Sequence, residues 1–151
     1  MSLAIMPRPR AGDWLEDEIA SWRSEEIRTV VSLHEAREVA ELGLVDEPRL
    51  CSGQGIEFVS FPIPDRGVPT SYGALNQLIV PLVPKVKGGH MVAVHCRAGI
   101  GRSAVVAAGI LLRSGVPYSQ VFPALSRARG VAVPDTDAQV AWVQAYAKMG
   151  L

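Results

Sequence analysis

The segment 94–103, with the sequence VHCRAGIGRS, constrains the fold of this chain more than any other. It follows a short apolar run at 91–95 that predicts a buried strand, and it precedes an alanine-rich apolar run at 103–113 that predicts a helix. Gly99 and Gly101 can adopt backbone conformations that turn successive N–H groups into one concavity. A strand, a glycine-rich loop and a helix in this order predict an anion site at the start of the helix.

The rest of the chain alternates strand and helix signals. β-Branched runs at 28–33 and 56–61 predict two further buried strands. Apolar residues at helical spacing predict helices at 13–22, 35–44, 71–86, 117–129 and 135–149. We therefore expect an α/β fold in one domain over 1–151, in which helices flank a central, mostly parallel sheet.

Three segments carry finer expectations. Asp13 should cap the first helix, and both Trp14 and Trp22 should pack in the core. The proline-rich stretch 62–69 should be irregular, because proline fixes φ and removes a hydrogen-bond donor. Two prolines inside 71–86 should kink that helix or end it early.

Composition excludes several classes of function. Lys and Arg number 15 and Asp and Glu number 15, so no overall charge attracts nucleic acid or an anionic membrane. No apolar run reaches the roughly 18 residues that cross a bilayer. Two cysteines are too few for a disulfide scaffold, which indicates a reducing, cytoplasmic setting. The histidines and cysteines lack metal-ligand spacing, so we expect no metal and no cofactor.

Several groups in the glycine-rich segment would act together on a phosphate. The backbone amides, the helix dipole and Arg102 should stabilise the thiolate of Cys96 at the mouth of the concavity. The planar guanidinium of Arg102 can bind two phosphate oxygens at once, and Ser103 can donate a hydrogen bond to the thiolate as it leaves a phosphoenzyme. The expected phosphate-binding residues are Arg97, Ala98, Gly99, Ile100, Gly101 and Arg102.

Residues 95–103 resemble the HCx₅R[S/T] signature of the cysteine-dependent protein tyrosine phosphatases. The short chain resembles the dual-specificity branch, and it is most similar to the kinase-associated phosphatase group. The sequence FPIPD at 61–65 and the sequence RARG at 127–130, which leads to Gln139, agree with that group in order. The resemblance covers roughly 27–147 and implies a protein tyrosine phosphatase-like fold. It also implies that Cys96 is the nucleophile, Arg102 binds phosphate and Asp65 is the general acid.

The chemistry of a phosphate ester supports the role of Asp65 independently. Cleavage needs a proton on the leaving oxygen, and a carboxylic acid on a mobile loop can supply it. Asp65 is the only carboxylate between Glu57 and Asp135, so we expect little else near the site to serve. Because Cys96 must be ionised while Asp65 is protonated, we expect a bell-shaped rate profile that peaks on the acid side of neutrality.

Each assignment has a plainer alternative. Cys96 could be a buried structural thiol, and Asp65 could be an ordinary turn residue. We expect His95 to be hydrogen-bonded behind the loop and to orient it, with strand filling as the alternative. Arg97 recognises substrate or is a solvated loop charge. Gln139 positions the hydrolytic water, as in related phosphatases, or is polar on an exposed helix face.

Asp135 and Asp137 are expected to cap the last helix rather than to act in catalysis. Cys51 has two interpretations: a partner for Cys96 in a protective disulfide, or a partly buried loop thiol.

The favoured function is hydrolysis of phosphotyrosine in proteins, with phosphoserine and phosphothreonine as further substrates. Phosphoinositides and other small phosphomonoesters are alternatives, although Ala98 and Ile100 stand where phosphoinositide phosphatases often carry lysine. Sulfur transfer, arsenate reduction and non-catalytic phosphate binding are further alternatives. The expected partner is a phosphorylated protein or peptide, with neither nucleic acid nor membrane.

Overall fold

Four parallel strands form the centre of the structure, a computed structural model that describes residues 1–149. Their order across the sheet is β1-β4-β2-β3, so the strand that leads into the glycine-rich loop has a neighbour on each side. The predicted α/β architecture with a parallel sheet is confirmed. The strands are β1 Leu3–Pro7, β2 Ile27–Ser32, β3 Glu57–Ser60 and β4 Met91–Cys96.

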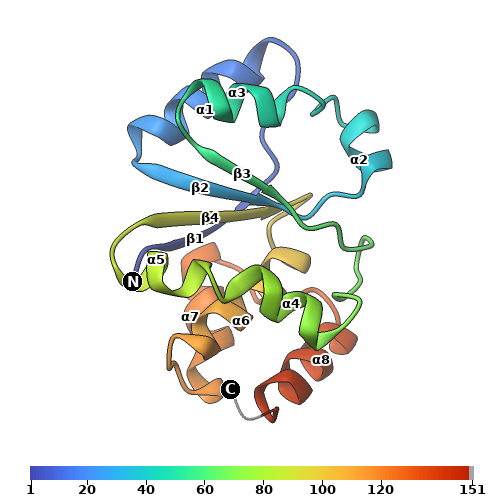
Figure 1. Ribbon diagram of the computed structural model, residues 1–151. Coiled ribbons are helices and arrows are strands. Elements are labelled where there is room, and N and C mark those ends of the chain that lie inside the picture. The colour runs from blue at the N-terminus through green and yellow to red at the C-terminus, as the bar shows by residue number, and fades with distance from the viewer. Residues whose placement is uncertain (150–151) are drawn as a thin grey trace.

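Helices cover both faces of the sheet (Figure 1). One face carries α1 Asp13–Ser24, α2 Ala36–Glu41 and α3 Glu47–Gly53. The other face carries α4 Tyr72–Ile79, α5 Leu82–Lys87, α6 Arg102–Arg113, α7 Tyr118–Arg129 and α8 Asp137–Ala147. No helix among residues 1–149 has the length and apolar character needed to cross a membrane.

Alternate residues of the central strands face opposite helical layers, because side chains alternate along a strand. Val30 of β2 packs in a cluster with Trp22 of α1 and Cys51 of α3. Its neighbour Val31 packs in the cluster on the other face, which includes Leu75 of α4. The two faces of the sheet therefore have separate cores.

Helix α6 is buried along most of its length, from Arg102 to Ile110. It packs against α7, α8 and α4 and against strands β1 and β4. A helix that is apolar on all sides suits this position. Because α6 is held on several sides, its N-terminus gives the glycine-rich loop a fixed end.

Strand β1 lies in residues 1–10, for which the sequence pattern predicts no element. Its backbone pairs with β4, and Pro7 lies opposite Cys96 in the register. This pairing brings the start of the chain beside the glycine-rich loop.

The run 71–86 forms two helices, α4 and α5. The first ends at Ile79, ahead of both prolines, so the expected early end is confirmed and the alternative of a kink is not, and Pro81 is the N-cap of the second. Helix α3 is an element that the pattern did not predict, although Pro48 in its first turn is a favourable position for proline.

The first helix also differs from expectation. Its N-cap is Gly12, and Asp13 is its first residue, so Asp13 is not the cap. Trp22 is buried as predicted, but Trp14 is 56% exposed and carries the guanidinium of Arg10 over its ring. Helical spacing alone did not distinguish the buried tryptophan from the exposed one.

Candidate active site

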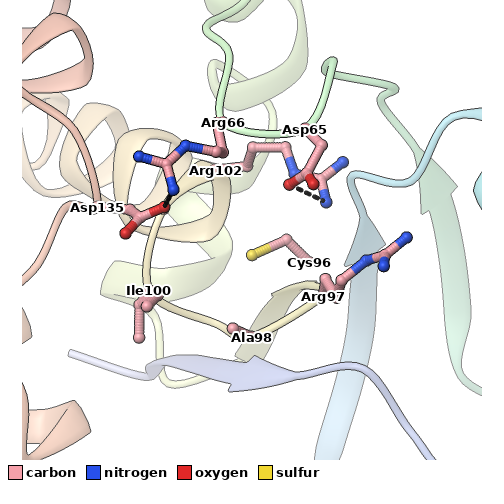
Figure 2. A pocket seen from close by; sticks show the side chains of 9 residues that line it. Asp65, Arg66, Cys96, Arg97, Ala98, Ile100, Arg102 and Asp135 are labelled. Carbon is pink, nitrogen blue, oxygen red and sulfur yellow. Dashed lines mark ion pairs between the residues drawn. The ribbon is translucent and has the colours of Figure 1, made fainter.

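A cavity of about 160 Å³ opens where β4 ends and α6 begins (Figure 2). Three segments form it: the glycine-rich loop, the loop that follows β3, and the turn that precedes α8. Its lining residues are Asp65, Arg66, Cys96, Arg97, Ala98, Ile100, Gly101, Arg102 and Asp135. The structure thus brings together most of the predicted site residues and adds Arg66 and Asp135.

The glycine-rich loop is held from outside by its carbonyl groups. The carbonyls of Ala98 and Gly99 accept hydrogen bonds of 3.0 Å from the guanidinium of Arg129, and the carbonyl of Arg97 accepts one from the backbone of Arg8. The N–H of a trans peptide points opposite to its C=O. The amides that follow these carbonyls therefore point away from their anchors, and they have no acceptor within residues 1–149.

Gly99 is required by both its backbone angle and its surroundings. Its φ is +73°, in the left-handed region that favours glycine. A Cβ at this position would lie 2.5 Å from the carbonyl carbon of Met6 at the end of β1. Strand β1 is therefore a wall against which the loop packs.

Cys96 lies almost buried at the end of β4, with its sulfur in the cavity (Figure 2). Its Sγ is 3.2 Å from Oγ of Ser103, in the first turn of α6. As a thiol Cys96 would donate this hydrogen bond, and as a thiolate it would accept it from the hydroxyl. Ser103 is fully buried, so this contact is shielded from water.

The guanidinium of Arg102 is fixed on one side and free on the other. Nη1 donates to Oε1 of Glu38 at 2.6 Å and to the carbonyl of Ile63 at 2.9 Å, and Nη2 donates to Oε2 of Glu38 at 2.9 Å. Nη2 also lies 3.3 Å from Oδ1 of Asp65. Nε has no acceptor within residues 1–149, so Nε and the Asp65-facing side of Nη2 are available to a phosphate.

The pair between Glu38 and Arg102 keeps both groups charged. Burial alone would raise the pKa of Glu38, but hydrogen bonds from Arg102 and from the backbone of Glu35, with the Arg102 charge, lower it to about 2. Burial opposes the charged form of Arg102, but Glu38 outweighs this effect and raises the pKa of the guanidinium. Arg102 is therefore a permanent cation.

His95 lies behind the loop with no solvent exposure. Its Nε2 donates to Oε2 of Glu47, at the start of α3, across 2.6 Å. The ring of His34 lies 5.3 Å away, and its Nδ1 is 3.3 Å from Oε2 of Glu38. Burial, with the nearby His95, lowers the pKa of His34 despite Glu38. These residues connect the back of the loop to the pair that holds Arg102.

Two expectations about the start of α8 were wrong. Thr136 is the N-cap, not Asp135 or Asp137, and it forms a capping box with Gln139. Asp135 instead lines the cavity, with Oδ2 3.5 Å from Nη1 of Arg66. A carboxylate besides Asp65 therefore stands in the site.

Gln139 is fully buried, which contradicts the alternative of an exposed helix face. Its Oε1 accepts hydrogen bonds from the backbone of Asp135 and Thr136. Its Nε2 donates to the carbonyl of Gly67 at 3.1 Å and lies beside Gly101. One N–H of the amide is left beside the loop.

Arg97 and Cys51 also have clear positions. Arg97 is half exposed at the cavity rim, 3.6 Å from Oε2 of Glu38. Cys51 is a fully buried helical residue rather than a partly buried loop thiol. It packs on the face of the sheet opposite the cluster that contains Cys96, so the sheet separates the two thiols. This placement does not support the disulfide interpretation.

Sequence reasoning missed Glu38 and Glu47, and it gave no structural role to Arg129. Glu38 is the fourth residue of a capping box that starts at Glu35, a local signal that its side chain folds back. No local signal points to Arg102, which is 64 residues further along the chain.

Comparisons with known proteins agree with this geometry. A family model, Tc-R-P, described as a polymorphic toxin system DSP-PTPase phosphatase, matches residues 4–116. Mouse laforin (Mus musculus) is 33% identical over 63 residues, which make up 42% of this chain and only 19% of laforin.

Solved structures give matches over nearly the whole chain. A kinase associated phosphatase with serine in place of its catalytic site cysteine superposes with a TM-score of 0.83 at 21% identity, covering 95% of this chain and 83% of that one. Tk-PTP in its active form matches with a TM-score of 0.76 at 26% identity, covering 97% and 90% of the two chains. The first likeness concerns the fold alone.

Proposed function

Because this chain belongs to the DSP-PTPase phosphatase family of polymorphic toxin systems, we propose that it is a protein phosphatase that forms a cysteinyl-phosphate on Cys96. Its substrates are phosphotyrosine proteins, with phosphoserine and phosphothreonine as further candidates. The single observation that carries the proposal is the composition of one cavity: a thiol, a fixed arginine and a carboxylate line it together.

Substrate binding uses donors that have no other partner within residues 1–149. The amides that follow the anchored carbonyls and the N–H of Nε would bind the phosphate oxygens. The phosphate also takes the side of Nη2 that faces Asp65. It thereby forms the parallel pair of hydrogen bonds that a guanidinium offers to an oxyanion.

In the first chemical step, the Cys96 thiolate attacks phosphorus. A P–S bond forms and the P–O bond to the leaving group breaks, while protonated Asp65 gives its proton to the leaving oxygen. Transfer of the phosphate from the ester to sulfur leaves Asp65 as a carboxylate.

In the second step, the Asp65 carboxylate takes a proton from water, which attacks phosphorus and breaks the P–S bond. The hydroxyl of Ser103 donates to the departing thiolate, and the remaining N–H of Gln139 orients the water. His95 orients the loop from behind through its bond to Glu47. Phosphate is released and the thiolate is restored.

Other chemistries receive less support. The lack of lysine at Ala98 and Ile100 disfavours substrates with several phosphates, and the rim arginines Arg66 and Arg97 each have a carboxylate neighbour. Arsenate reduction needs a partner thiol, and Cys51 lies on the other face of the sheet. Because both cysteines are free, we assign the activity to a reducing compartment such as the cytoplasm.

The test is hydrolysis of p-nitrophenyl phosphate between about pH 5 and 8 without metal. The parent should turn over with a bell-shaped profile, Cys96→Ser should be inactive, and Asp65→Asn should be slower. Cys51→Ala is the matched control, since it removes the other thiol and should retain activity. Phosphate release from phosphotyrosine and phosphoserine peptides then assigns the substrate class. A parent that binds vanadate without turnover would indicate a binding module instead.

A further inference from the structure

Two contacts join the loop after β3 to the start of α8 across the cavity. We call residues 62–69 the acid loop, because it carries Asp65. Nη1 of Arg66 lies 3.5 Å from Oδ2 of Asp135, and Figure 2 shows this ion pair at one side of the cavity and Asp65 beside Arg102 at the other. The carbonyl of Gly67 accepts a hydrogen bond from Nε2 of Gln139 at 3.1 Å.

The backbone of the acid loop makes Arg66 and Asp65 move together. The N–H of Gly67 donates to the carbonyl of Pro64 at 2.7 Å, which closes a tight turn. Arg66 in this turn has a backbone φ of +60°, which residues other than glycine rarely adopt. Such a conformation persists where neighbouring contacts hold it. Because the turn is short and closed, fixing Arg66 fixes the adjacent Asp65.

Asp65 needs an attachment besides Arg102 because a bound substrate competes for the same guanidinium. Asp65 contacts Nη2 of Arg102 through Oδ1, and this is its one ion pair within residues 1–149. A bound phosphate takes over that side of the guanidinium. Asp65 then loses its own anchor at the moment when it must face the leaving oxygen.

We propose that the ion pair of Arg66 and Asp135 is a strap that positions Asp65 for proton transfer once phosphate has displaced it from Arg102. This inference rests on the proposed phosphatase function. Asp135 is a positioning residue, which acts on the acid loop through Arg66. The pair also neutralises a carboxylate on the cavity wall that would repel phosphate.

The experiment compares Arg66→Met, Asp135→Asn and the double variant on two esters of different leaving group. Phenyl phosphate has a poor leaving group and depends strongly on the general acid, whereas p-nitrophenyl phosphate depends on it less. A half-exposed ion pair predicts a loss of about three- to fivefold in kcat for phenyl phosphate. The loss for p-nitrophenyl phosphate should be about twofold at most.

Three further results should follow. The double variant should be no slower than either single variant, because each single substitution already removes the same ion pair. Arg66→Lys should recover most of the lost rate. In an Asp65→Asn background, removal of the strap should have no further effect. Arg49→Met and Asp46→Asn are matched controls, since this exposed pair at the start of α3 has a similar separation of 3.6 Å.

Several outcomes would overturn the strap while leaving the phosphatase function intact. One is an equal loss of kcat for phenyl phosphate and p-nitrophenyl phosphate. Another is a loss in the double variant equal to the product of the two single losses, and the last is an unchanged kcat in all three variants. A further loss from Asp135→Asn in the Asp65→Asn background would show that Asp135 acts on the substrate itself. A parent that hydrolyses neither ester would overturn the proposed function and the strap with it.

Discussion

The carboxylate of Glu38 holds the guanidinium of Arg102 by two hydrogen bonds, of 2.6 Å and 2.9 Å. Glu38 is itself held by the N–H of Glu35 and by His34. A bidentate pair of this kind fixes the plane of the guanidinium. The N–H groups of Nε and Nη2 that remain for phosphate are therefore oriented before substrate binds.

The first prediction concerns acid stability. The ordinary pKa of Glu38, 4.5, falls to about 2 in the folded chain, so its stabilising effect is complete above pH 4.5 and is lost as pH falls toward 2. The shift corresponds to about 3 kcal/mol in the free energy of unfolding. Glu38→Gln should remove this pH dependence and destabilise the protein at pH 7. The measurement is the free energy of unfolding in urea, compared at pH 7 and at a pH below 4.5.

Glu41→Gln serves as the control for Glu38→Gln, because Glu41 is on the same helix in an exposed pair with Arg37. It should leave unfolding unchanged to within about 0.5 kcal/mol. If the parent and Glu38→Gln lose stability equally on acidification, Glu38 is not the group responsible.

The second prediction concerns the glycine-rich loop, and it separates the cost of a steric clash with β1 from the cost of a positive φ. Gly99→Ala places a methyl group against the backbone of Met6 at a positive φ, and it should cost about 3 kcal/mol or more and weaken vanadate binding. Gly115 also has a positive φ, of +99°, but open space around it. Gly115→Ala should cost only about 1 kcal/mol. Similar costs would mean that β1 does not confine the loop.

The third prediction concerns the second chemical step. Ser103→Ala removes the hydroxyl that lies 3.2 Å from the Cys96 sulfur. A hydrogen bond to a charged group contributes about 1.5–3 kcal/mol, so release of phosphate from sulfur should slow about tenfold or more. Rapid mixing should then reveal a burst of p-nitrophenol before slow turnover.

Ser114→Ala is the control for Ser103→Ala, since that hydroxyl donates to a carbonyl at the far end of the same helix. It should show no burst. A loss of rate in Ser103→Ala without a burst would place the role of the hydroxyl in the first step instead.

The fourth prediction concerns oxidation. Burial and the neighbouring charge of Glu47 raise the pKa of Cys51 to about 12, so it has little thiolate at neutral pH. A thiol must ionise to attack an oxidised cysteine. Peroxide should therefore inactivate the parent without forming a disulfide between Cys51 and Cys96, and Cys51→Ala should recover with dithiothreitol at the same rate. Detection of that disulfide by mass spectrometry would refute this account.

The sequence predicted those parts of the molecule whose signals are local. The loop 94–103 combines a strand, glycines and a helix start within ten residues, so its form and its place at the end of β4 could be anticipated. The place of Asp65 in the cavity was anticipated because FPIPD at 61–65 resembles the kinase-associated phosphatase group and no other carboxylate lies between Glu57 and Asp135. These features depend on neighbours in the chain.

The parts that escaped prediction depend on distant contacts. Strand β1 is a short edge strand, and only its pairing with β4 distinguishes it from a loop. Glu38 and Asp135 are ordinary surface-type residues whose partners lie on other segments. The burial of Trp22 and the exposure of Trp14 likewise depend on where the sheet lies rather than on helical spacing.

The partners of the Arg102 guanidinium come from far along the chain: Leu33, Glu38 and Ile63 are 69, 64 and 39 residues away. Contacts over such separations require long loops to close, so the cavity exists only in the folded chain. An anion that binds only the completed cavity shifts the folding equilibrium toward the native chain, by about 2.7 kcal/mol at a hundredfold excess over its Kd. Inorganic phosphate, the product of the proposed reaction, would then be a thermodynamic stabiliser of the protein that releases it.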